Sequence, residues 1–185
     1  MNISKQEAQA SLAEIENVIS QTRRAIAHGG TGTKLIIWGI IWLLGYSSSQ
    51  FFRNINGTIW LLLILFGVIA SWICGVRNKP LTKNSNYGRV GLFWLILFGY
   101  ALVWLVLLQP VSSKAVGAFW ATIPMFAYVV GGLWFGRFFV WLGLIVTALA
   151  VAGFFLLPAW FDLWMAVTGG GALILSGLFI RKFWR

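Results

Sequence analysis

Long apolar runs, each close to the length of a membrane-spanning helix, fill most of the chain after residue 33. There are six such runs, which short polar or charged stretches separate from one another: Leu35–Phe52, Gly57–Gly75, Gly88–Leu108, Ala115–Phe135, Phe138–Leu157 and Ala159–Ile180. A helix needs about 20 apolar residues to cross the hydrocarbon core of a bilayer. Because the runs are continuous rather than alternating, helices are favoured over a β-barrel. The pattern therefore predicts an all-α bundle of six transmembrane helices over residues 34–185.

Residues 1–33 have a different pattern. Apolar positions recur there at spacings of three and four, which predicts an amphipathic helix with one narrow stripe. The stripe consists of Leu12, Ile15, Ile19, Thr22 and Ile26. The glycines of residues 28–32 are expected to end this helix. The stripe has two readings: it lies on the membrane surface or the bundle, or it binds a partner, with Leu12, Ile15, Ile19 and Ile26 as the candidate contact residues.

Composition supports the membrane prediction. The 185 residues are 59% apolar and 10% charged, whereas a soluble domain has about 25% charged residues. The net charge of +10 would suggest nucleic acid in a soluble protein. Here the basic residues flank apolar runs, which indicates contact with a lipid bilayer and its anionic headgroups and no direct contact with nucleic acid. The polar residues 1–17 do not resemble a cleavable signal peptide.

The basic residues also predict an orientation. If six spans alternate in direction, all the Lys and Arg residues except Arg53 and Lys114 lie on one side. Cytoplasmic loops are enriched in such residues, so we expect a multi-pass protein of the cell (inner or plasma) membrane with both termini in the cytoplasm. Tryptophans gather near both ends of the predicted spans, as they do at membrane interfaces.

Few residues offer chemistry. Ionisable groups within the bilayer are the usual candidates for function, and none lies in the middle of a predicted span. His28 and Cys74 are the single histidine and the single cysteine, so neither a metal site nor an internal disulfide is expected. We therefore predict no catalytic set, no metal and no cofactor. Asp162 is the one acid after Glu16, and it is either a helix first-turn residue or a cation or proton site at the outer surface.

Small residues and helix breakers mark candidate packing or solute-path positions. In the fourth span, Gly132 and Gly136 have the GxxxG spacing of a helix contact, and Pro124 is expected to kink the helix. In the sixth span, a polar group and three consecutive glycines are expected to loosen the helix. These residues are Thr168, Gly169, Gly170 and Gly171. Irregular helices near the bilayer midplane form substrate sites in many transporters.

Two apolar motifs resemble those of small bacterial membrane proteins of uncharacterised function. The motifs are RRAIAHGG before LIIWGIIWLLG, and GGGALILSGLFIRK. This resemblance implies six helices and a short cytoplasmic amphipathic helix. Three successive hairpins, over 34–77, 88–137 and 137–182, are similar to the plan of the HdeD-type acid-resistance membrane proteins. A true triplication and shared constraints of membrane insertion both explain the hairpins, and neither resemblance implies a mechanism.

Two functional hypotheses follow. The first is a non-enzymatic regulatory or scaffold protein whose N-terminal helix engages a cytoplasmic protein or a second copy of the chain. Its basis is an amphipathic helix beside a bundle without catalytic residues. The second is a small transporter or channel for an apolar or neutral solute, which would use the irregular helices.

Overall fold

The computed structural model describes residues 5–78, 87–108 and 112–184, although several side chains of the first helix lie outside the description. It is all-α, as predicted. Its elements are α1 (Lys5–His28), α2 (Thr31–Phe51), a 3-10 turn η1 (Arg53–Ile55), α3 (Asn56–Arg77), α4 (Tyr87–Leu107), α5 (Ser113–Phe135), α6 (Arg137–Leu156), α7 (Phe161–Met165), the π-helical η2 (Ala166–Gly170) and α8 (Gly171–Phe183). Since α7, η2 and α8 follow one another without a break, the described chain forms seven helical rods.

Five of these rods are long and apolar enough to cross a membrane. They cover Arg53–Arg77, Arg89–Leu107, Ser113–Phe135, Arg137–Leu156 and Phe161–Phe183. This is the helix composition of a multi-pass membrane protein. The first predicted span, now α2, is not among the five. Lys34 and the polar residues Ser47–Gln50 shorten its apolar stretch, and glycines and tryptophans interrupt it.

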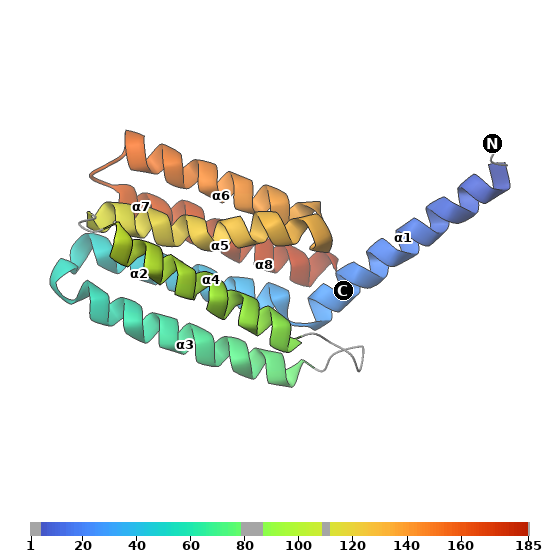
Figure 1. The fold of residues 1–185 in the computed structure, drawn as a ribbon, viewed down its shortest axis with the longest axis horizontal. Coiled ribbons are helices and arrows are strands. Elements are labelled where there is room, and N and C mark those ends of the chain that lie inside the picture. The colour runs from blue at the N-terminus through green and yellow to red at the C-terminus, as the bar shows by residue number, and fades with distance from the viewer. Residues whose placement is uncertain (1–4, 79–86, 109–111, 185) are drawn as a thin grey trace.

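The helix α2 lies at the centre of the bundle, against α3, α7, η2 and α8 (Figure 1). Its contact with η2 and α8 is made by glycines on both sides. A Cβ atom at Gly39 would lie 2.8 Å from the carbonyl oxygen of Gly170, and one at Gly170 would lie 2.9 Å from the carbonyl oxygen of Gly39. Two turns away, Gly32 and Gly177 meet in the same way. The two backbones are therefore in direct contact, as small residues allow in membranes.

The helices α5 and α6 form the second tight pair. A Cβ atom at Gly143 would lie 2.6 Å from the carbonyl oxygen of Met125, and one at Gly132 would meet the backbone of Val140. Gly132 is thus a packing residue. Gly136 is not: it follows the end of α5 with φ of 121°, and nothing lies within 4 Å of its Cβ position. The predicted GxxxG face is therefore corrected to one packing glycine and one glycine that turns the chain between two helices.

The helices α3 and α4 lie at the periphery. In each, 6% of the most apolar stretch is buried, against 39% in Phe161–Phe183. Aromatic contacts join α4 to α5: the ring centroids of Trp94 and Tyr128 lie 6.0 Å apart, as do those of Phe98 and Trp120. Of the predicted hairpins, α2 with α3 is well packed and α4 with α5 is packed only lightly. The packing thus does not follow three equal hairpins.

Candidate functional site

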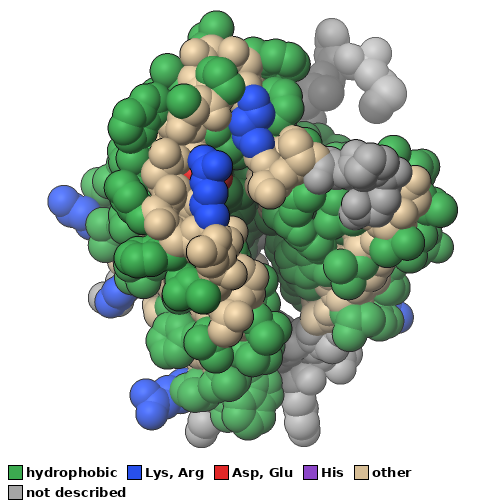
Figure 2. Space-filling model, turned by 90° about the vertical axis from the view of Figure 1, so that its left-hand side faces the viewer, with side chains coloured by type: hydrophobic (Ala, Val, Ile, Leu, Met, Phe, Trp, Pro, Cys, Tyr) green, Lys and Arg blue, Asp and Glu red, His purple; other side chains and the backbone are tan. Residues whose placement is uncertain are grey.

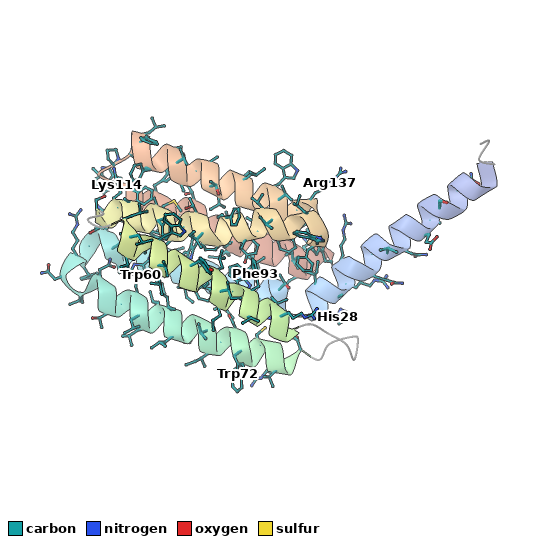
Figure 3. All side chains as sticks on the ribbon, in the orientation of Figure 1. His28, Trp60, Trp72, Phe93, Lys114 and Arg137 are labelled. Carbon is teal, nitrogen blue, oxygen red and sulfur yellow. The ribbon has the colours of Figure 1, made fainter. Side chains whose placement is uncertain are left out.

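The alternating direction of the helices collects the basic side chains at one end of the bundle. We call this the basic end, defined by Lys34, Arg77, Arg89, Arg137, Arg181 and Lys182. Arg53 and Lys114 lie at the opposite end. Figure 3 shows the separation, with Arg137 and His28 at one end of the bundle and Lys114 at the other. Sequence pattern alone predicted this charge asymmetry.

The polar run Ser47–Gln50 forms a hydrogen-bonded helix end at the opposite end of the bundle. The Ser48 hydroxyl donates to the carbonyl oxygen of Gly45 over 2.7 Å, and the Trp60 indole donates to the Ser49 hydroxyl over 2.9 Å. The Gln50 amide donates to the carbonyl oxygen of Ala159 over 3.2 Å. These bonds tie α2 to α3 and to the turn before α7, which gives the polar run a structural role.

Asp162 lies at this same end, in the first turn of α7. Its carboxylate is partly exposed, and one of its oxygens would lie 3.9 Å from a Cβ atom at Gly117. The Tyr46 hydroxyl donates to the carbonyl oxygen of Gly117 over 2.8 Å. Figure 2 looks onto this end and shows basic side chains near the centre of a largely hydrophobic surface, with an acidic atom beside one of them. The carboxylate therefore sits in a mixed polar cluster, where it also complements the start of α7.

The irregular positions of the two predicted solute-path helices do not form a shared polar site. α5 continues through Pro124, and the Thr122 hydroxyl donates to the carbonyl oxygens of Ala118 and Phe119 in its own helix. The predicted loosening of the last helix is present as η2. However, the Thr168 hydroxyl donates to the carbonyl oxygen of Trp164, again in its own rod.

The glycines of η2 are covered by α2. A Cβ atom at Gly169 would lie 2.9 Å from the Trp42 ring, and one at Gly170 would lie 3.0 Å from the Leu43 amide nitrogen. Gly171, in contrast, has nothing within 4 Å of its Cβ position. The π-helical turn therefore brings two of the three glycines against the central helix.

The base of α1 is held by three separate contacts. In the turn to α2, Gly30 has φ of 73°, and a Cβ atom there would lie 2.5 Å from the Asn78 amide nitrogen and 2.7 Å from the Cys74 sulfur. The Arg23 guanidinium lies 5.7 Å from the centroid of the buried Trp184 ring. In addition, the partly buried Ile26 and Ala27 pack against the hydrophobic core. The direction of α1 is thus set by contacts to α3 and to the end of α8.

The predicted stripe of α1 is described at one of its candidate positions. Ile26 contacts the core, whereas the side chains of Leu12, Ile15 and Ile19 lie outside the described residues. Figure 1 shows α1 leading away from the bundle, with the His28 end of the helix next to it. Sequence reasoning missed Cys74 and Asn78 as partners of the Gly30 turn, and Trp184 as the partner of Arg23. The glycine-rich sequence predicted a helix end but contained no signal of what packs on it.

The described residues contain no candidate metal site. There, no three His, Cys, Asp or Glu side chains come together as a cluster. The buried side chains of the described core are hydrophobic.

Comparisons with known proteins give no family for this chain. No family model, no curated protein and no solved structure matches it.

Proposed function

We propose that the chain is a non-enzymatic membrane protein whose α1 helix engages a cytoplasmic protein partner or a second copy of the chain. The observation that carries this proposal is the position of α1. It is fixed at its base by the contacts of Gly30 and Arg23, and beyond its last turn it leads away from the bundle (Figure 1). An amphipathic helix held clear of its own bundle presents its stripe to something else.

In this proposal α2 is a sixth span and the basic end faces the cytoplasm. α2 has 21 residues, which corresponds to a length of about 30 Å. Its lower hydropathy suits a central helix, because neighbouring helices rather than lipid cover most of its glycines and tryptophans. Single cysteines at Asn54 and at Arg137, in a Cys74→Ser background, test this topology. A membrane-impermeant maleimide should label Asn54→Cys on intact cells and Arg137→Cys only after permeabilisation. Labelling of both on intact cells would contradict it.

The charges along α1 favour a protein partner over the membrane surface. The acids Glu7, Glu14 and Glu16 belong to the part of the helix far from the bundle, and Arg23 and Arg24 are at its base. An anionic leaflet attracts the arginines and repels the acids. A helix lying flat would bring all of them to the headgroups. The charge order therefore suits a helix whose base meets the membrane and whose acidic part stands away from it.

The stripe itself provides the test. We expect a variant with Leu12→Ser, Ile15→Ser and Ile19→Ser to lose the partner contact, because the apolar side chains that drive it are gone. The matched control changes the opposite, exposed face by Ala13→Ser, Asn17→Ser and Gln21→Ser. The mass of the full chain in lipid nanodiscs and the pattern of crosslinked proteins are measured for both variants.

The outcomes distinguish between the two possible partners of α1, a second copy of the chain and a cytoplasmic protein. A fall in mass in the stripe variant alone identifies a second copy of the chain. An unchanged mass with loss of one specific crosslinked protein identifies a cytoplasmic partner. If neither the mass nor the crosslinks change, or if the control variant changes as much as the stripe variant, the proposal is rejected.

The π-helical turn is the observation that favours a second candidate, a small transporter for a neutral solute. Irregular segments of this kind often occur at functional sites. Against this candidate, the Thr168 hydroxyl is satisfied within its own helix, and Trp42 and Leu43 cover Gly169 and Gly170. Flux of glycerol into liposomes that contain the chain, above the rate of protein-free liposomes, would favour the transporter.

A further inference from the structure

The cations at the two ends of the bundle differ in how they are compensated. At the opposite end, the Lys114 ammonium donates to the carbonyl oxygen of Phe154 over 3.2 Å and lies 4.3 Å from the centroid of the Phe154 ring. Asp162, in the first turn of α7, is an acidic side chain at this same end. At the basic end, the described residues provide no carboxylate within 4.0 Å of any of the six cations. Within the described residues, an external anion would therefore meet no competing carboxylate at these cations.

In the turn between α5 and α6, one of these cations lies between two exposed tryptophans along the sequence. Arg137 is exposed and follows the open turn at Gly136. Trp134 is 72% exposed and Trp141 is 63% exposed, one on each helix of the pair. Exposed tryptophan rings on membrane proteins sit at the level of the lipid headgroups. We therefore expect the Arg137 guanidinium to lie at the depth of the lipid phosphates.

The end of α8 has two more cations at a comparable position. Arg181 and Lys182 are exposed in the last turn. The stem of Arg181 lies against Gly32 of α2, and the Lys182 ammonium lies 5.3 Å from the centroid of the Phe183 ring. Long cationic side chains cover apolar surface with their stems while their charges reach the interface. We therefore expect both charges to reach the boundary between protein and headgroups.

We propose that the basic end binds anionic phospholipids, with Arg137 and the pair Arg181 and Lys182 as headgroup ligands. A lipid fits better than a nucleic acid or an acidic protein because the cations adjoin lipid-facing apolar side chains, such as the exposed Leu133 and Phe183. A ligand with an anionic head and apolar tails matches both surfaces at once. The inference rests on the membrane location of the helices and is independent of what α1 binds.

The test compares lipids of equal acyl chains on the purified full chain. Native mass spectrometry measures the retention of phosphatidylglycerol and of phosphatidylcholine. An interfacial Lys or Arg strengthens binding to an anionic surface about fivefold. The variant R137Q/R181Q/K182Q should therefore lose roughly a hundredfold of the preference for phosphatidylglycerol. The control R53Q/K114Q removes the cations of the opposite end and should keep the preference.

A charge-conserving variant guards against a fold defect. R137K/R181K keeps all three charges and should retain phosphatidylglycerol like the unchanged chain, and added salt should weaken retention in both. Equal retention of the two lipids by the unchanged chain would overturn the proposal. So would an equal loss of preference in the control, or a loss in R137K/R181K as large as in the glutamine variant.

Discussion

The seam between α2 and α8 and the attachment of α4 to α5 show two ways of joining helices in one bundle. In the seam, Gly32 and Gly39 of α2 bring their backbone against Gly177 of α8 and Gly170 at the end of η2, and a Cβ atom at Gly39 would lie 2.8 Å from the carbonyl oxygen of Gly170. At α4, aromatic rings meet with centroids 6.0 Å apart, and Gly91 and Gly99 have nothing within 4 Å of their Cβ positions. The sequence alone does not distinguish the glycines of the two regions, but backbone atoms closely cover those of the seam, and nothing covers Gly91 and Gly99.

The difference follows from the solvent. In lipid, apolar side chains gain little free energy by moving from the acyl chains to a helix contact. Close packing of the backbones therefore contributes most of the free energy of helix association. The seam offers such packing and α4 does not. We therefore infer that α2 and α8 form the stable centre of the bundle and that α4 is the span most easily displaced.

The largest effect is expected from filling the seam. Gly39→Leu should lower the free energy of unfolding by about 3 kcal/mol, because its side chain would enter the space of Gly170 and Ile174. For a chain of this size, this corresponds to a fall in melting temperature of about 6–12 °C in detergent. Gly39→Ala should have a smaller effect in the same direction, since only the Cβ atom must be accommodated.

Gly99 provides the matched control on α4. Gly99→Leu adds the same side chain where nothing lies within 4 Å, and leucine is a better helix former than glycine by up to about 1 kcal/mol. Its melting temperature should be unchanged or slightly raised. If Gly39→Leu melts at the same temperature as Gly99→Leu, the seam is not the stable centre of the bundle.

The fold class and the helix positions could be predicted because hydrophobic length is a strong constraint in membranes. A run of apolar residues such as α3 must be a helix for its backbone groups to be satisfied in lipid. The basic end could be predicted for a separate reason, because Lys and Arg are enriched in the loops on one side of a membrane. Hydropathy alone does not identify α2 as a span. A central helix can have glycines and polar groups in place of apolar residues, because neighbouring helices cover them.

Which helices pack against one another could not be predicted, because a glycine indicates a contact face but not the residue that it contacts. Gly39 and Gly170 meet although 130 positions separate them in numbering, and no local pattern encodes that distance. The spacing of Gly132 and Gly136 suggested one shared face, yet the second glycine turns the chain before Arg137. The contact of Cys74 and Asn78 with Gly30 is likewise a product of tertiary packing.

The smallest effect is expected where α4 meets α5. Phe98→Leu removes the ring contact with Trp120, and such aromatic pairs contribute about 0.5–1.5 kcal/mol. The melting temperature should fall by only a few degrees, whereas hydrogen–deuterium exchange should rise in α4 and stay unchanged in α2. Phe93→Leu is the control, because the exposed Phe93 has its ring contact with Trp94 of its own helix (Figure 3). Faster exchange in α2 after Phe98→Leu would show that α4 supports the centre of the bundle, against the division drawn between the two regions.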